Sequence, residues 1–382
     1  MTDIDAELTG DLRAFRDMCR EIAPELRDRA LAVDADPLAM AEHLDSETLR
    51  LLRTACTPKR FRVEDVPAAA DSYTASCLAR AIGNLELGRG DAALLTANTG
   101  PSLAGLAVDA LGDDAQQELF YRAIEDGRTW TFFAMTEPDR GSDATAITTR
   151  LDADPTGGYR LSGTKRYISN AVRGSIGVVF ARTGGTALSI RGALVHRPRP
   201  GVAVEMLDMI GLRGACISEL TLDDVEVPAE HLLGGHLPQS KRGIWGAGRA
   251  FNIMRVQIAA QALGVAFAVC DYVREHRPAA PGLDLLSARL DAARQLLYDV
   301  AIEVDNAPDD RRWPSVAKLH ATDLAVRVTR AAAEALGPGS LLEHPLLEKW
   351  SRDVYALEFM DGTSNILRLS IAPNLTPSGL SS

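Results

Sequence analysis

The sequence predicts an α+β protein of several domains, with an N-terminal helical domain, a central β-barrel or sandwich and a C-terminal helical bundle. Three observations predict this order. Apolar residues recur at helical spacing up to about residue 128, short alternating runs follow to about residue 237, and long Ala-rich helical patterns fill the rest. The expected domains are therefore 1–128, 129–237 and 238–382. A length of 382 residues accommodates two or three domains.

Helices separated by turn residues make up the first predicted domain. The stretch AELTGDLRAFRDMCREIA carries apolar residues at helical spacing, with Asp and Arg between them. SYTASCLARAIGNLELG and DAQQELFYRAIEDG repeat this pattern, and the latter ends on a glycine, which is a helix stop signal. We therefore expect amphipathic helices throughout this part of the chain.

The pattern changes near Trp130 and changes back near residue 241. Between them, GYRLSGTKRYIS, SIGVVFART, RGALVHRP and GVAVEML are short β-like runs divided by Gly, Pro and Asp, a spacing that favours a small barrel or sandwich. Three long helical stretches follow, with RPAAPG at 277–282 as a linker. Ala-rich helices of this length usually bury most of their circumference, as they do in a bundle.

Composition and charge narrow the classes of protein. The formal net charge is −11, which disfavours nucleic acid, because phosphates favour a basic face. Five widely spaced cysteines give no disulfide framework, so reduced thiols and a cytoplasmic location are expected. Neither a signal peptide nor a stretch of the ~20 apolar residues that span a membrane is expected. The seven histidines show no metal-ligand spacing, so no metal site is expected.

Five blocks of the sequence carry a family resemblance. FFAMTEPDRGSDATAITTRL, at 132–151, resembles the acyl-CoA dehydrogenase flavoprotein signature. YRLSGTKRYISN (159–170), GLRGACISELTLDDVEVPAEHLLG (211–234), RVQIAAQALGVAFAVCDYV and the closing ALGPGSLLEHPLLEKWSRDVYALEFMDGTSNILRLSIA are similar to that family's later segments, in the same order. The resemblance covers nearly the whole chain. It implies an FAD enzyme whose C-terminal domain is a four-helix bundle.

The resemblance also implies a catalytic base. In this family a glutamate just before a Gly-Thr pair removes the α-proton of an acyl thioester, and the β-hydrogen leaves as hydride to flavin N5. The corresponding residue here is Asp361, and Arg255 is expected beside it; the alternative for Arg255 is a salt bridge on the helix surface. The family's alternative base position is occupied by Met254, which cannot accept a proton. A carboxylate between apolar substrate and flavin is expected to have a raised pKa, which suits a general base.

Asp361 is one methylene shorter than the family's glutamate, which withdraws the carboxylate by roughly 1.3 Å. A misplacement of ~1 Å can lower a rate ~100-fold. Three interpretations follow. The substrate sits closer and Asp361 is still the base; the base or the flavin reaction is a different one; or Asp361 caps the following turn without a catalytic role.

The resemblance assigns residues to the flavin as well. The expected contacts are Phe133, Met135, Thr136, Gly141 and Ser142 in one strand and loop, Tyr167, Ile168 and Ser169 in another, and Thr363 after the base. Hydroxyl groups in such loops also serve as turn caps, which is the alternative interpretation of Thr136, Ser142 and Ser169.

Two departures from the family concern the FAD diphosphate. The family's Arg-x-x-Phe-Gly stretch, whose arginine reaches the neighbouring subunit's FAD, is shortened here, and either Arg274 or Arg277 would have to replace that arginine. The family's Gln-x-x-Gly-Gly-x-Gly begins here with Glu334 and retains Gly337. An anionic side chain near a diphosphate is unfavourable unless a cation intervenes.

The leading functional hypothesis is FAD-dependent α,β-dehydrogenation of an acyl thioester, carried on CoA or on an acyl carrier protein (ACP). The degraded motifs indicate a specialised enzyme of secondary metabolism, such as polyketide extender-unit biosynthesis. The alternatives are a flavin-dependent monooxygenase on the same fold and a non-catalytic acyl-carrier-binding relative. The resemblance further implies a homodimer or homotetramer and an electron-transfer flavoprotein as acceptor. Neither a nucleic acid nor a membrane is expected as a partner.

Overall fold

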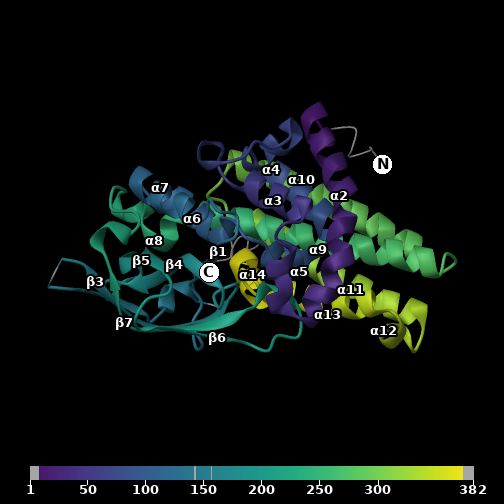
Figure 1. The fold of residues 1–382 in the computed structure, drawn as a ribbon. Helices are drawn as coiled ribbons and strands as arrows, with labels where there is room; N and C mark the ends of the chain where they lie inside the picture. Colours follow the sequence, from purple (N-terminus) through teal and green to yellow (C-terminus); the bar gives the residue numbers. More distant parts are fainter. Residues whose placement is uncertain (1–7, 142, 156, 373–382) are drawn as a thin grey trace, which may run out of the picture.

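The computed structural model describes residues 8–141, 143–155 and 157–372. The strands gather at one end of the molecule, and the end of the C-terminal helical domain around α12 lies at the other (Figure 1). Along the chain, helices α2 to α7 come first, strands β1 to β7 follow, and helices α8 to α14 close the chain. This is the predicted order of helices, sheet and helices. The domain limits themselves stay a prediction.

Within the residues that the structure describes, six α-helices precede the sheet. Their bounds are Gly10–Ala35 (α2), Glu47–Cys56 (α3), Cys77–Gly88 (α4), Ala92–Ala97 (α5), Ser102–Leu111 (α6) and Asp114–Arg122 (α7). Local sequence explains most of the starts, because a Ser, Thr or Asp side chain accepts a backbone N–H at the N-cap of α2, α3, α4, α5 and α7. Asp113 and Gln116 complete a capping box at α7.

Seven strands form one mixed sheet. Their bounds are Trp130–Ala134 (β1), Arg150–Ala153 (β2), Tyr159–Ile168 (β3), Gly174–Arg182 (β4), Ile190–His196 (β5), Val202–Met206 (β6) and Ser218–Val227 (β7). The order is β1-β4-β2-β3-β7-β6, and β5 also pairs with β4. Only the single pair Arg150–Arg182 joins β2 to β4. The β1–β4–β5 part and the β2–β3–β7–β6 part are therefore nearly separate.

A shared core lies between these two parts of the sheet, as in the predicted sandwich. Val179 and Ala181 of β4 belong to an apolar cluster that also contains side chains of β3 and β7. The alternate residues Ile176, Val178 and Phe180 pack into a second cluster with α6 and α7. Strand β4 is therefore buried on both faces, which explains its nearly continuous apolar sequence.

The C-terminal domain is built around one long helix. The bounds are Gly243–Gly246 (α8), Gly248–His276 (α9), Leu283–Asn306 (α10), Arg312–Leu336 (α11), Ser340–Glu343 (α12), Pro345–Phe359 (α13) and Ser364–Ile371 (α14). Helices α10, α11 and α13 pack against α9, which completes a four-helix bundle. Helix α4 also packs on α9, because Gly88 and Gly264 permit close approach: a Cβ added at Gly264 would lie 2.3 Å from the carbonyl oxygen of Leu85.

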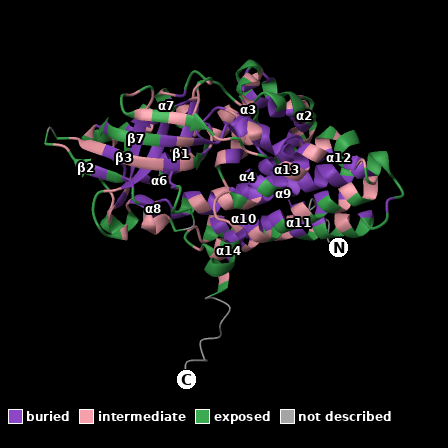
Figure 2. Ribbon diagram, turned by 90° about the horizontal axis from the view of Figure 1, so that it is seen from below, coloured by how far each residue is buried: buried purple, intermediate pink, exposed green. Residues whose placement is uncertain are grey.

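Helix α9 corrects one expectation from the sequence. Within the described ranges it is a helix long and apolar enough to cross a membrane, with a mean hydropathy of 1.6 over its most apolar window. However, 89% of that window is buried inside the molecule, and Figure 2 shows α9 surrounded by other helices. Its apolar character is therefore that of a core helix.

A buried charge cluster joins the three parts of the chain. The ammonium of Lys349 on α13 donates to the carboxylate of Asp91, the N-cap of α5, and to that of Asp353 at 2.6 Å. Asp353 also accepts the backbone N–H of Leu212, in the segment between β6 and β7, at 2.6 Å. All three charged side chains are at most 1% exposed. These contacts fix α13, and hence the turn that follows it, relative to the rest of the molecule.

Candidate active site

Asp361 lies in the turn that connects α13 to α14. Its φ angle is 49°, and that of Gly362 is 105°, so two consecutive residues adopt the left-handed region. Glycine has no steric cost there, and aspartate tolerates this conformation better than most residues. Such backbone conformations persist only where surrounding structure holds them, and they concentrate at functional sites.

One of the groups holding this turn is Arg255 on α9. Its Nε donates to the backbone carbonyl of Asp361 at 3.2 Å. Burial lowers the pKa of Arg255, and the Asp361 carboxylate opposes that shift. The structure thus brings together the two residues predicted from the sequence to act in catalysis.

Lys318 on α11 is a third member of the site, and it was not predicted from the sequence. Its fully buried ammonium donates to the carbonyl of Glu358 at 2.8 Å and to that of Gly362 at 2.6 Å. A signal existed, because Lys318 shares one apolar helix face with Pro314, Ala321 and Ala325 at spacings of three and four residues. A lysine on such a face is expected to have buried partners.

The electrostatic surroundings suit Asp361 to proton transfer. Burial raises the pKa of the Asp361 carboxyl group, whereas the cations Lys318 and Arg255 lower it, and the net shift is upward. A carboxylate with a raised pKa is a stronger base and remains available near neutral pH.

Strand β1 reaches the same stretch of α9. The ring of Phe133 lies 5.9 Å, centre to centre, from that of Phe251 on α9, in an edge-to-face arrangement. Phe251 precedes Arg255 by four residues, so the two side chains lie on one face of α9, one helical turn apart. The end of β1 and the Asp361 turn therefore face neighbouring turns of one helix.

The loop after β1 is anchored to β3 and leaves space beside Gly141. The carbonyl of Met135 accepts from the Lys165 ammonium, and that of Thr136 accepts from the backbone N–H of Arg166, each at 2.9 Å. A Cβ added at Gly141 would meet only the Thr136 methyl group, at 3.8 Å. Ser142, also predicted to contact flavin, lies outside the described residues.

The end of β3 presents an aromatic ring and a hydroxyl group. Tyr167 has a φ angle of 63° and is 54% exposed, at a point where the pairing of β3 with β7 shifts register. Ser169 is half-buried, whereas the side chain of Ile168 belongs to the core of the sheet. Only the backbone of Ile168 is therefore available to a ligand, whereas the side chains of the exposed Tyr167 and the half-buried Ser169 are accessible.

Glu334 and Gly337 are remote from the other predicted residues within one chain. They lie near the end of α11, and Glu334 is about 24 Å along the helix from Lys318. Glu334 forms an exposed ion pair with Arg330 at 3.1 Å, so a cation does accompany its charge. Arg277 donates to the Ala335 carbonyl, which places it at this helix end, whereas Arg274 pairs with Asp271.

The residues present fit FAD. A flavin ring needs flat apolar surface together with polar groups at its edge, and the ends of β1 and β3 provide Phe133 and Tyr167 together with the hydroxyl groups of Thr136 and Ser169. Gly337 has a φ angle of 99°, and a Cβ added there would meet nothing within 4 Å, so a ligand can approach its backbone closely. Thr363, the half-buried N-cap of α14, completes the set.

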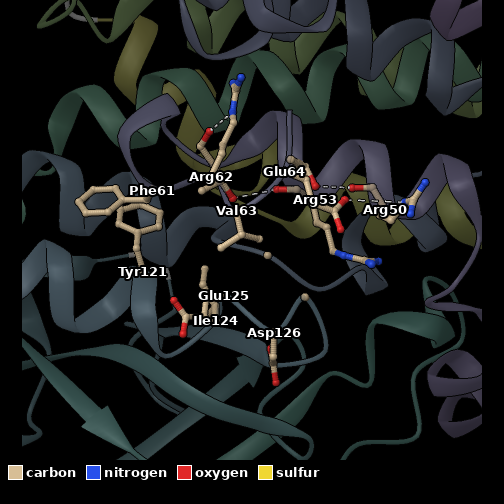
Figure 3. Close-up of a pocket in the computed structure, with 14 residues that line it drawn as sticks. Arg50, Arg53, Phe61, Arg62, Val63, Glu64, Tyr121, Ile124, Glu125 and Asp126 are labelled. Atoms are coloured by element: carbon tan, nitrogen blue, oxygen red, sulfur yellow. Dashed lines mark hydrogen bonds and ion pairs between the residues drawn. The ribbon is translucent and has the colours of Figure 1, made fainter. Parts of the chain in front are cut away.

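A separate hollow of about 530 Å³, including space open to solvent, lies between the N-terminal helices and the loop before β1 (Figure 3). Its lining is strongly charged, and its cations have partners: Arg62 donates to Asp71, and Arg53 to the Leu44 carbonyl. It contains none of the residues predicted for the site. Because acyl-binding clefts are mainly apolar, we do not assign the substrate to it.

A buried ion pair supports the loop that carries Thr136. The Glu137 carboxylate accepts the backbone N–H and hydroxyl groups of Thr148 and Thr149, and the Lys165 ammonium at 3.0 Å. Burial opposes ionisation of Glu137, but the hydrogen bonds from Thr149 and the charge of Lys165 outweigh it and lower its pKa to about 2. Burial also disfavours the charged form of Lys165 and lowers its pKa to about 8, although the negative charge of Glu137 opposes this shift.

This pair predicts a component of acid unfolding. A carboxyl group with a depressed pKa stabilises the fold fully above its unfolded value near 4.3, and this stability is lost as the pH falls toward 2. Glu137→Gln should therefore lower the free energy of unfolding at pH 7, on the order of 3 kcal/mol. The difference in unfolding free energy between wild type and variant should be smaller at pH 3 than at pH 5, as measured by urea unfolding at equal FAD loading. Glu226→Gln, at an exposed ion pair on β7, is the control; an equal loss at both pH values would contradict the assignment.

The comparisons with known proteins agree with this fold. Residues 132–225 match the model of the acyl-CoA dehydrogenase middle domain, and residues 283–376 match that of the C-terminal domain. The chain is 30% identical to rat (Rattus norvegicus) mitochondrial short-chain specific acyl-CoA dehydrogenase, over 97% of this chain and 91% of the rat protein.

Solved structures show the same fold. Butyryl-CoA dehydrogenase from Megasphaera elsdenii superposes with a TM-score of 0.82 at 24% identity, over 97% of this chain and 99% of the other. The prolyl acyl carrier protein oxidase AnaB gives 0.80 at 22% identity, over 97% and 100%. The fold and the 30% identical relative together define a flavin-dependent oxidoreductase. The chain belongs to the acyl-CoA dehydrogenase family, whose cofactor is FAD.

Proposed function

We propose that this protein dehydrogenates an acyl thioester between its α and β carbons, with Asp361 as the base. The observation that carries the proposal is the placement of the Asp361 carboxyl group. It sits in a left-handed turn, its pKa is raised, and two cations act on it: Arg255 on α9, the helix that β1 also contacts, and Lys318 on α11. Neither a surface loop nor a simple helix cap requires this combination.

Each residue has a defined task in this reaction. The Asp361 carboxylate accepts the α-proton, and its backbone N–H hydrogen-bonds the thioester carbonyl, whose polarisation acidifies the α-carbon. Arg255 holds the backbone of the base through the Asp361 carbonyl. Phe133, Thr136, Tyr167, Ser169 and Thr363 would hold FAD. When bound, FAD supplies the acceptor for the hydride that leaves the β-carbon.

The shorter side chain of Asp361 has a consequence for the substrate. Its carboxylate reaches roughly 1.3 Å less far than that of a glutamate at the same backbone position. In our proposal the α-carbon of the substrate therefore lies correspondingly closer to the α13–α14 turn. The same displacement in a site shaped for glutamate would lower the rate ~100-fold.

The thioester carrier is either CoA or an acyl carrier protein. The relatives named above include acyl-CoA dehydrogenases and an oxidase whose substrate is carried on an acyl carrier protein, so the fold is compatible with both. We propose a role in secondary metabolism, in the cytoplasm, with an electron-transfer flavoprotein as acceptor. The five cysteines are free thiols, which is consistent with that compartment.

We also propose a homodimer or homotetramer. Glu334 and Gly337 lie far from Asp361 within one chain, and a second chain would bring them to the neighbouring FAD. Large apolar side chains on the C-terminal helices are exposed, among them Leu342 at 86%, Phe359 at 64% and Leu369 at 68%. Exposed apolar surface of this kind is typical of an interaction site.

An anaerobic absorbance titration tests the proposed reaction and its carrier together. Matched acyl-CoA and acyl-carrier-protein thioesters are added to FAD-loaded protein, with the corresponding free acids as controls. We expect one class of thioester to bleach the oxidised-flavin band, while the free acids leave it unchanged. Absence of bleaching by every thioester, together with oxygen-dependent turnover of reduced flavin, would instead support a monooxygenase. Protein that fails to bind FAD would support a non-catalytic role.

A further inference from the structure

We propose that Lys318 is the positioning residue for Asp361, and that it fixes both the conformation of the α13–α14 turn and the charge state of the carboxyl group. This inference rests on the proposed function of Asp361 as the base. Within the described residues, the Lys318 ammonium forms no hydrogen bond or ion pair with Thr136, Tyr167 or any other residue assigned to the flavin. The hydrogen bonds of this ammonium go to the last turn of α13 and to the turn that follows it.

Lys318 satisfies two carbonyls that flank the base. They belong to Glu358, in the last turn of α13, and to Gly362, directly after the base. Carbonyls at a helix C-terminus have no partner within the helix, so a buried one requires another donor. The Lys318 ammonium donates to both carbonyls, and it thereby fixes the backbone before and after Asp361.

The turn is held from two directions. Arg255 approaches the Asp361 carbonyl from α9, while Lys318 approaches the flanking carbonyls from α11. The two helices pack against each other. The turn is therefore tied to two elements of the rigid bundle, and its left-handed conformation at residues 361 and 362 persists because these bonds oppose relaxation.

The charge of Lys318 also acts on the base. Lys318 from α11 and Arg255 from α9 are the charged groups that act on the carboxyl group, while Glu358 from α13 acts on Lys318 and Arg311 acts on Arg255. Burial lowers the pKa of Lys318 to about 8, so its ammonium is largely charged at neutral pH. Removal of Lys318 would leave Arg255 as the remaining cation that lowers the pKa of Asp361. The carboxyl group would then hold its proton to a higher pH.

Three variants test this inference. Lys318→Met removes the ammonium and keeps the apolar stem, Lys318→Arg restores a permanent cation, and Thr322→Val is the matched control. Thr322 is buried one turn further along α11, and among the described residues its hydroxyl bonds only to carbonyls of that helix. We expect Lys318→Met to lower kcat by about 10- to 100-fold, because displacement by ~1 Å has effects of this size. The KM should change little.

The pH profile separates positioning from a merely structural role. The acidic limb of kcat/KM reports the free enzyme's base. In Lys318→Met this limb should move up by about one pH unit, because an opposite charge has been lost. It should stay in place in Lys318→Arg and in Thr322→Val. An unmoved limb in Lys318→Met, at equal FAD content and thermal stability, would overturn the inference.

A second measurement needs no variant of Lys318 and no turnover. The carboxyl carbon of Asp361 is followed by ¹³C NMR in Asp-labelled wild-type protein and assigned by its loss in Asp361→Asn. We expect a second inflection near pH 8, where Lys318 loses its proton. Its absence would contradict the assignment. Retained activity in Asp361→Asn would instead refute the proposed base, so the two failures are distinguishable.

Discussion

Asp361→Asn should abolish most of the bleaching of the flavin by an acyl thioester. Asparagine has nearly the same shape and keeps the backbone, but it cannot accept the α-proton. General base catalysis contributes about 10²- to 10⁴-fold, so we expect a loss in this range in the rate of flavin reduction. Stopped-flow absorbance under anaerobic conditions measures that rate directly.

Asp361→Glu is the informative companion variant. It keeps the carboxylate but extends it by roughly 1.3 Å. If the substrate lies closer to the turn in this protein, the longer side chain is misplaced, and the rate should also fall. A faster rate in Asp361→Glu would show that the site is still shaped for the longer acid. Unchanged rates in Asp361→Asn, with FAD bound, would reduce Asp361 to a turn residue.

Lys349→Met should cause the largest loss of stability among the variants considered. The substitution leaves the carboxylates of Asp91 and Asp353 buried without their shared cation. Removing one partner of a buried ion pair typically costs about 3–5 kcal/mol, and here two carboxylates lose theirs. Because the cluster joins α5, α13 and the segment before β7, we expect all three parts of the protein to unfold more readily in urea.

The pH dependence of this loss identifies its cause. Burial raises the pKa of Asp353 even in the intact protein, and the Lys349 ammonium opposes that shift. Without the ammonium the carboxyl group can become neutral, so the defect of Lys349→Met should be smaller at pH 5 than at pH 8. Arg327→Met is the control, because it breaks an exposed pair with Asp323, which is worth about 0.5 kcal/mol. Equal losses in both variants would contradict the buried-cluster interpretation.

The order of helices, sheet and helices could be predicted because local pattern determines it. Helical spacing, N-caps and short alternating runs are properties of neighbouring residues. The family resemblance, confirmed by the comparisons, supplied the position of Asp361 and the identity of FAD. The parallel pairing of β1 with β4 could not be predicted in this way, since the two strands are about 40 residues apart and no sequence pattern in either strand indicates its partner.

The roles of the buried lysines were the main features that sequence reasoning missed. Lys165, Lys318 and Lys349 are all at most 1% exposed, yet lysine is usually a surface residue. Most of their partners are distant in sequence, as Asp91 is from Lys349, although Asp353 lies only four residues from Lys349 on α13. By contrast, the Arg330–Glu334 pair could have been predicted from its spacing of four residues on a helix.

The most direct test of the central claim is the exchange of a thioester's α-hydrogen for deuterium in D₂O. An acyl thioester with sulfur in place of the β-carbon has no β-hydride to lose, so exchange reports the base alone. We expect wild-type protein to accelerate this exchange, and Asp361→Asn to return it to the uncatalysed rate. Equal exchange in both proteins, or none in wild-type protein that binds the thioester, would contradict Asp361 as the base.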